Sequence, residues 1–188
     1  MTVRRLVAAG CALLLLAGCG ADPGREPAAG DRGTPAQSSE QADGPSTSSA
    51  EHSGPWDLVL TDVRLSRRRG GERIVLELDG TGVPGWSVAY TDVAVLDGSG
   101  ETLDLRGDVV LDIYASGTVA PGAEGYRGGR RVVPAGAGRV TDLHVVGTFE
   151  GHTQVLAGIA GGRVPFRVRA LGDPTRLVVD LGVDTTSP

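Results

Sequence analysis

Few residues of this 188-residue chain could do chemistry. Its two cysteines, Cys11 and Cys19, both lie within the first twenty residues, and its three histidines are His52, His144 and His152. His144 and His152 are the one candidate pair, but no cysteine or His-x-x-Glu-type pattern accompanies them. A catalytic zinc site needs about three protein ligands and an open position, which this spacing does not offer. We therefore expect no metal site and no cofactor.

Other catalytic arrangements have little support. Ser99 lies in a glycine-rich turn, and the chain contains no Gly-x-Ser-x-Gly nucleophile elbow. Asp104, Asp108 and Asp112 could suggest a cation site or a glycosidase pair, but on β structure they need not share a face, so we expect a solvated edge. The turn at residues 97–101 has too few ligands for a calcium loop. The sequence predicts that the protein is not an enzyme.

A binding surface is better supported. Glycan-binding surfaces combine an exposed aromatic ring with planar hydrogen-bonding groups, and arginine makes forked contacts to carboxylates. The candidate ligand-binding residues are Trp86, Tyr90, Tyr114, Tyr126, Arg127, Arg130 and Arg131. Two alternatives stay open, because Trp86 and Tyr90 could be core residues and Arg130 and Arg131 could belong to a solvated loop.

The start of the chain predicts its compartment. Two arginines precede an apolar run at residues 6–16, which is shorter than the roughly 20 residues of a membrane span and typical of a signal peptide. The run ends in Leu16-Ala17-Gly18-Cys19, which resembles the bacterial lipobox. The resemblance implies that residues 1–18 are a lipoprotein signal peptide and that acyl chains such as palmitate on Cys19 bind the lipid bilayer, at the extracytoplasmic face of the cell membrane. An ordinary signal peptide with an incidental cysteine is the alternative.

Composition divides the rest of the chain in two. Residues 20–55 are rich in Gly, Pro, Ala, Ser and acidic residues and contain no large aliphatic or aromatic side chain. Residues 19–55 are therefore predicted to be the lipidated cysteine and a disordered tether, and residues 56–184 to be one domain.

All 18 basic residues are arginine, which is typical of a GC-rich genome such as that of an actinobacterium. From Trp56 onward 14 arginines stand against 17 acidic residues, which argues against a nucleic-acid partner.

The domain has the two-residue periodicity of β-strands and no sustained helical spacing. In its two clearest strands, residues 73–78 and 176–181, one face reads Arg, Val, acid and the other is aliphatic. Antiparallel pairing in register would place Arg73 opposite Asp180, whereas parallel pairing would oppose two arginines. About nine short strands predict an all-β fold, an antiparallel two-sheet β-sandwich. A long glycine-rich loop, residues 117–139, carries Tyr126 and the candidate arginines.

The ordered motifs resemble the AMIN-like domain of actinobacterial lipoproteins, which is akin to the AMIN domain of cell-wall amidases and secretins. They are GERIVLEL at 71–78, PGWSVAY at 84–90, DGSG at 97–100, GYRG at 125–128, FEG at 149–151, PFRV at 165–168 and DPTRLVVDL at 173–181. The resemblance, which implies two similar sheets, offers a third arrangement, in which the strands at 73–78 and 176–181 lie on separate sheets and each arginine has another partner.

The same resemblance implies a non-catalytic, membrane-anchored envelope lipoprotein, but it does not supply the ligand of the domain. Because the candidate aromatic and arginine residues suit a glycan, our hypothesis is that the long loop and the nearby strand faces bind peptidoglycan or another wall polymer. Two other functions stay open. One is a module that docks an envelope protein through an exposed sheet edge. The other is a small-ligand-binding lipoprotein, which would have a deep and mostly apolar pocket.

Overall fold

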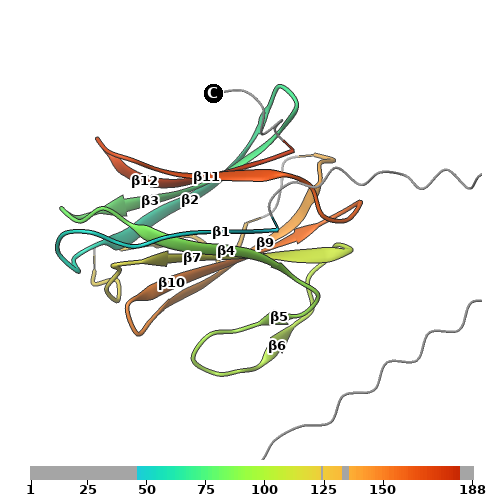
Figure 1. Cartoon of the computed structure of the whole chain (residues 1–188). Coiled ribbons are helices and arrows are strands. Elements are labelled where there is room, and N and C mark those ends of the chain that lie inside the picture. The colour runs from blue at the N-terminus through green and yellow to red at the C-terminus, as the bar shows by residue number, and fades with distance from the viewer. Residues whose placement is uncertain (1–45, 124, 133–135, 183–188) are drawn as a thin grey trace, which may run out of the picture. The chain divides into compact units, whose positions relative to one another are not determined.

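Alternation of aliphatic and polar residues folds the chain into two antiparallel sheets that pack face to face (Figure 1). The structure, a computed structural model, describes residues 46–123, 125–132 and 136–182. Cys19, the predicted signal peptide and most of the predicted tether lie outside these residues. All regular structure in the described ranges is β, so the predicted antiparallel two-sheet β-sandwich is confirmed. These ranges include no helix that is long and apolar enough to cross a membrane.

The larger sheet has six strands in the order β1-β4-β7-β10-β9-β8. They are β1 (Thr47–Ala50), β4 (Gly85–Thr91), β7 (Val109–Ser116), β10 (His152–Ile159), β9 (Val140–Phe149) and β8 (Arg131–Val132). Its inner face is aliphatic, and Leu111, Ile113 and Val155 on its central strands are fully buried. Because side chains alternate along a strand, Asp112 and Tyr114 on β7 point to the other, outer face of the sheet.

The smaller sheet has four strands in the order β11-β12-β3-β2. They are β11 (Phe166–Leu171), β12 (Thr175–Leu181), β3 (Gly71–Asp79) and β2 (Val59–Arg68). Strands β3 and β12 are the two Arg–Val–acid strands. They pair antiparallel, with Arg73 opposite Asp180 and Arg176 opposite Glu77. The in-register antiparallel pairing of these two strands is therefore confirmed, and their placement on separate sheets is wrong. Side by side, the strands bring opposite charges together across the ladder, and both of their aliphatic faces enter one core.

Two short strands lie where the sequence predicted irregular chain. Strand β1 lies within the predicted tether and pairs with β4 from Thr47 to Ala50. An edge strand of small polar residues needs little apolar burial, because the backbone ladder and a hydrogen bond from Trp86 Nε1 to Ser48 Oγ (3.1 Å) hold it. Strand β8 interrupts the predicted loop at residues 117–139 and pairs with β9.

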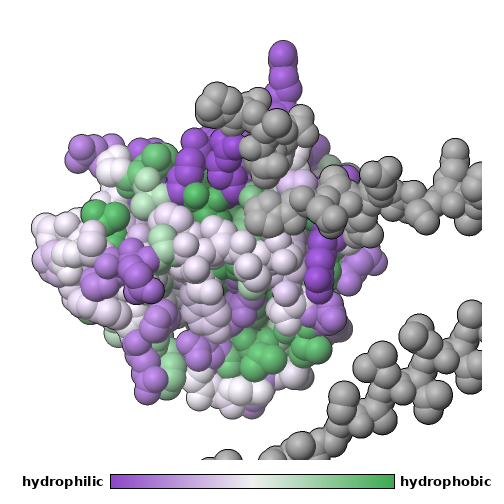
Figure 2. Space-filling view, viewed as in Figure 1, coloured by the Kyte–Doolittle hydropathy of each residue, from purple (hydrophilic) through white to green (hydrophobic). Residues whose placement is uncertain are grey.

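A small hairpin, β5 (Ala94–Val95) and β6 (Thr102–Leu103), crosses the outer face of the six-stranded sheet. Its predicted turn at residues 97–100 has two glycines with positive φ, Gly98 (81°) and Gly100 (71°). Beneath it a second apolar cluster joins Ala94 to Val110 and Leu156. In Figure 2 hydrophobic surface gathers around the place where Figure 1 draws this hairpin. The hairpin thus forms one side of a hollow on an otherwise open sheet face.

Candidate functional site

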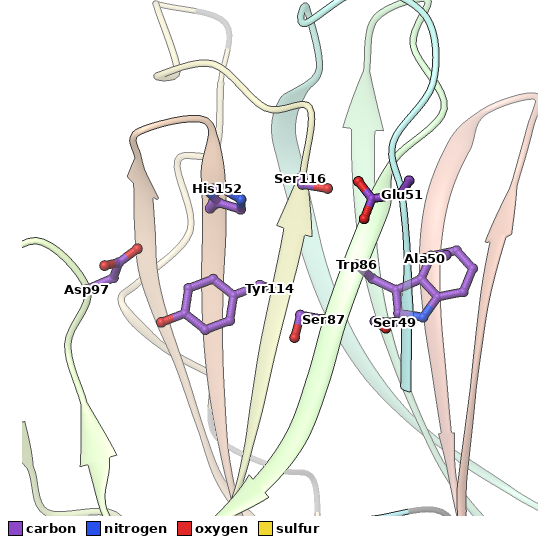
Figure 3. A pocket seen from close by; sticks show the side chains of 9 residues that line it. All are labelled: Ser49, Ala50, Glu51, Trp86, Ser87, Asp97, Tyr114, Ser116 and His152. Carbon is purple, nitrogen blue, oxygen red and sulfur yellow. The ribbon is translucent and has the colours of Figure 1, made fainter. Parts of the chain in front are cut away.

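A polar pocket of about 420 Å³ lies on the outer face of the six-stranded sheet, next to the β5–β6 turn (Figure 3). We call it the Tyr114 pocket. Four strands and the turn contribute to it, and it is lined by Ser49, Ala50, Glu51, Trp86, Ser87, Asp97, Tyr114, Ser116 and His152. Three serine hydroxyls, two carboxylates, an imidazole and a phenol make a lining suited to hydrogen bonding. Its volume falls within the usual range of ligand sites, about 300–1,000 Å³.

A buried glutamine fixes the Tyr114 side of the pocket. Gln154 is fully buried, and its Nε2 lies 2.9 Å from the Tyr114 hydroxyl, 3.1 Å from Asp112 Oδ1 and 2.9 Å from Val95 O. Its Oε1 accepts a hydrogen bond of 2.9 Å from the Asp97 backbone N–H. One side chain therefore links strand β7 to the hairpin, and it sets where the Tyr114 ring and Asp97 lie. Since Gln154 donates to the Tyr114 hydroxyl, that hydroxyl can donate its own proton to a ligand.

Burial changes the acidity of the groups around Gln154. Desolvation raises the pKa of Asp112 to about 6, with the Gln154 hydrogen bond opposing the shift and the nearby Asp97 charge adding to it. Burial and the charges of Asp112 and Asp97 raise the pKa of Tyr114 to about 12, so its hydroxyl stays protonated at neutral pH. Asp112 was expected to lie on a solvated edge with Asp104 and Asp108. For Asp112 that expectation is wrong, because β7 is a central strand of the sheet and the Asp112 carboxylate accepts a hydrogen bond from the buried Gln154.

Two exposed rings stand beside the pocket. Trp56 is 52% exposed and Phe149 is 45% exposed. The Trp56 ring packs on Gly151, the neighbour of His152, and lies 4.4 Å from the His52 ring between centroids. The Phe149 ring packs on Gly98, the neighbour of Asp97. Neither ring lines the pocket itself, but each packs on a glycine next to a lining residue, and an exposed aromatic ring there can give a ligand an apolar face on which to stack.

Neither Trp56 nor Phe149 is among the ligand-binding residues predicted from the sequence. In a regular strand Phe149 would share a face with Leu143 and Val145, because all three are odd-numbered positions of β9. The register between β9 and β10 shifts between Gln154 and Val155, where Val146 is an extra residue, and this bulge turns Phe149 outward. Nothing in the local pattern marks a bulge there except Gly147, which has a φ of 121°. Trp56 stands at the first position of the predicted domain and has no periodic neighbours to give its direction.

Two of the predicted ligand-binding residues pack against the core instead. The Tyr90 hydroxyl donates to Val164 O at 2.9 Å, and the Tyr90 ring meets the Phe166 ring edge to face at 5.6 Å between centroids. Trp86 borders the Tyr114 pocket, but its indole packs against the core and donates to Ser48. Figure 3 shows the indole turned away from the Tyr114 ring. For both residues the core alternative agrees better with the structure.

The loop residues form a separate site. Tyr126 and Arg130 line a second pocket of about 230 Å³ with Leu60, Pro121, Gly128, Val145, Val146, Gly147 and Thr148. Arg130 Nη1 donates to Val146 O at 3.2 Å, and Arg127 is exposed. Arg131 instead pairs with the buried Asp142, with 2.7 Å between Nε and Oδ1. The predicted residues are thus divided between the Tyr114 pocket, this second pocket, the core and an ion pair, rather than brought together.

The candidate pair of histidines does not converge on a site. His144 lies on β9 opposite Arg131, and desolvation together with Arg130 lowers its pKa. His152 lies at the start of β10, and its Nδ1 is 3.1 Å from Glu150 O. The described residues contain no group of three or more His, Cys, Asp or Glu side chains that could hold a metal ion.

Comparison with known proteins gives one match. The family model of the AMIN-like domain matches residues 58–183, which are about two thirds of the chain. No curated protein and no solved structure matches the chain. The matched segment begins in the residue before β2, so β1 and the stretch that carries Glu51, His52 and Trp56 lie outside it.

Proposed function

The chain belongs to the AMIN-like domain family, and we propose that it is a non-catalytic binding module of the cell envelope that holds a hydroxyl-rich wall polymer, such as peptidoglycan, in the Tyr114 pocket. The observation that carries the proposal is the combination of a polar pocket with the two exposed rings, Trp56 and Phe149, beside it. Lipid chains on Cys19 would hold the module at the extracytoplasmic face of the membrane.

The pocket chemistry supports a hydroxyl-rich ligand. A sugar ring presents hydroxyl groups at its edge and C–H groups on its faces. The serines at 49, 87 and 116 can donate to and accept from hydroxyls, while Glu51 and Asp97 can accept from them. The rings of Trp56 and Phe149 can cover the C–H faces. A small apolar ligand would leave these polar groups without partners, so the polar lining disfavours the small-ligand alternative.

The anchor and tether would set how far the domain reaches. With β1 beginning at Thr47, residues 20–46 would separate the acylated cysteine from the sheet. As a flexible coil these 27 residues would span roughly 26–31 Å root-mean-square. Such a tether would allow the domain to search the polymer above the bilayer.

Replacement of Cys19 by Ser tests the anchor: we expect the protein to leave the membrane fraction, and retention there would contradict lipidation at this residue.

Cosedimentation of the detergent-solubilised full-length protein with insoluble peptidoglycan tests the binding function. We expect retention above that of an unrelated protein of similar charge, and loss of retention in the Trp56→Ala and Phe149→Ala variants. Both side chains are about half exposed, so the sandwich should still fold. Leu171→Ala is the matched control, because it removes a comparably exposed hydrophobic side chain from the other sheet. Equal retention of all four proteins would refute the Tyr114 pocket as the site.

A further inference from the structure

We infer that the ligand of the Tyr114 pocket carries a positive charge, an ammonium group on a hydroxyl-bearing chain, and that Glu51 and Asp97 receive it. The inference rests on the proposed function and narrows its ligand to a chemical class. It would make the site selective for amino sugars with free amines over their N-acetylated forms.

The two carboxylates come from opposite sides of the pocket. Asp97 lies on the hairpin turn, and Glu51 directly follows β1. In Figure 3 they flank the Tyr114 ring and Ser116, with Asp97 on the hairpin side and Glu51 on the β1 side. A ligand seated over Tyr114 would therefore lie between two negative charges carried by different parts of the chain.

The charges around the pocket favour a cation. Arginines elsewhere in the described chain pair with other carboxylates, among them Asp180, Asp142 and Glu77. Asp97 Oδ1 accepts a hydrogen bond of 3.0 Å from the Gly98 backbone N–H, an uncharged partner. The one lining residue that can carry a positive charge is His152. A ligand carboxylate would meet like charges here, whereas the ammonium groups of an amino-sugar chain would meet a carboxylate at either side of the pocket.

The Tyr114 ring adds to this preference. It lies nearly perpendicular to the His152 ring, with 6.3 Å between ring centroids and an interplanar angle of 82°. The negative face of a tyrosine ring attracts cations that lie within about 6 Å of its centroid. A ligand ammonium group within that distance of the Tyr114 ring face would gain a further favourable electrostatic contact, besides those with Glu51 and Asp97.

Glu51 lies outside the segment that matches the family model, which begins at residue 58. It reaches the pocket because β1 pairs with β4, opposing Ser49 to Ser87 and Ala50 to Trp86. Residues 49–51 thus form one wall of the pocket. The selectivity inferred here is therefore a property of this chain, which a fragment confined to the matched segment would lack.

Isothermal titration of the full-length protein with two oligosaccharides of equal length tests the inference. One is an oligomer of glucosamine, and the other is an oligomer of N-acetylglucosamine, at a pH where free amines are protonated. We expect the glucosamine oligomer to bind at least about tenfold more tightly. Glu51→Gln and Asp97→Asn should each weaken its binding about fivefold, the effect of one close charge pair at a solvated site, and should leave binding of the N-acetylated oligomer nearly unchanged.

Glu101→Gln is the charge-matched control, since Glu101 is an exposed carboxylate of the same hairpin that does not line the pocket. It should change neither affinity, which separates a local effect from general attraction of a polycation to an acidic domain. Equal affinity for the two oligomers would overturn the inferred charge selectivity and leave the proposed function standing. Binding of neither oligomer, together with failure of the peptidoglycan cosedimentation, would reject the proposed function itself.

Discussion

Asp180 on β12 lies directly opposite Arg73 on β3, and its carboxylate accepts a hydrogen bond of 2.9 Å from Arg73 Nη2. Arg169 Nη2 on β11 donates to the same carboxylate at 2.7 Å, so one buried acid joins three strands of the four-stranded sheet. Desolvation alone would raise the pKa of Asp180, but the hydrogen bonds and charges of the two arginines outweigh it and hold that pKa below its usual value.

Replacement of Asp180 by Asn should therefore destabilise the domain substantially. The amide cannot neutralise two arginines, and the half-buried Arg73 would lose its charged partner. We expect the free energy of unfolding to fall by about 3 kcal/mol, as found when one partner of a buried ion pair is removed. Urea denaturation of wild type and variant at pH 7 measures it.

Glu77→Gln is the control for that experiment. Glu77 pairs with Arg64 on the neighbouring strand, but the Arg64 side chain is 54% exposed. Solvated pairs of this kind contribute about 0–1 kcal/mol. If both variants lost the same stability, burial of Asp180 would not be the cause.

Truncation of a core strand residue should be costly. Leu177 on β12 is fully buried between the sheets, and Leu177→Ala should lower the free energy of unfolding by about 2–5 kcal/mol. Leu171→Ala, at a leucine of β11 that is 37% exposed, should cost well under half as much. Thermal or urea unfolding of both variants gives the comparison. Similar losses would show that Leu177 is not part of a closely packed core.

The strand faces around Leu177 and Arg73 could be predicted from sequence because they depend on local alternation and on charge pairing across neighbouring strands. Strand β1 could not, because serine and threonine at an edge strand resemble the tether before them. Phe149 could not be placed either, since one bulged residue reverses every side chain beyond it. The Tyr114 pocket depends on contacts of residues 49, 97 and 114, which are distant in sequence and have no pattern in common.

Gln154 should hold the β5–β6 hairpin on the sheet. Gln154→Met keeps the side-chain volume but leaves Val95 O and the Asp97 N–H without their partner. Each unsatisfied buried group costs about 1–3 kcal/mol, and the hairpin can avoid this cost by opening to solvent. We expect faster amide hydrogen exchange at Asp97 while the amides of β7 and β10 stay protected. Glu101→Gln, at an exposed side chain of the same hairpin, should leave the exchange of Asp97 unchanged.

The raised pKa of Asp112 should make stability depend on pH between about 4 and 7. A carboxyl whose folded-state pKa is about 6 keeps its proton where the unfolded chain, with a value near 3.8, has lost it. The folded state binds more protons in this window, so the contribution of Asp112 is fully present below pH 4 and is lost as pH rises through 6.

Asp112→Asn removes this titration and keeps an oxygen that can accept from Gln154. The free energy of unfolding of the variant minus that of wild type should therefore rise between pH 4 and pH 7, by about 1–2 kcal/mol after allowance for solvent screening. Subtracting the two curves also cancels the stability contribution of Asp180. Because the folded-state pKa of Asp180 is lowered, that contribution is present at pH values above its unfolded-state pKa and is lost only at more acidic pH. A flat difference for Asp112→Asn would mean that this carboxyl ionises as it does in the unfolded chain, and that burial does not shield it from water.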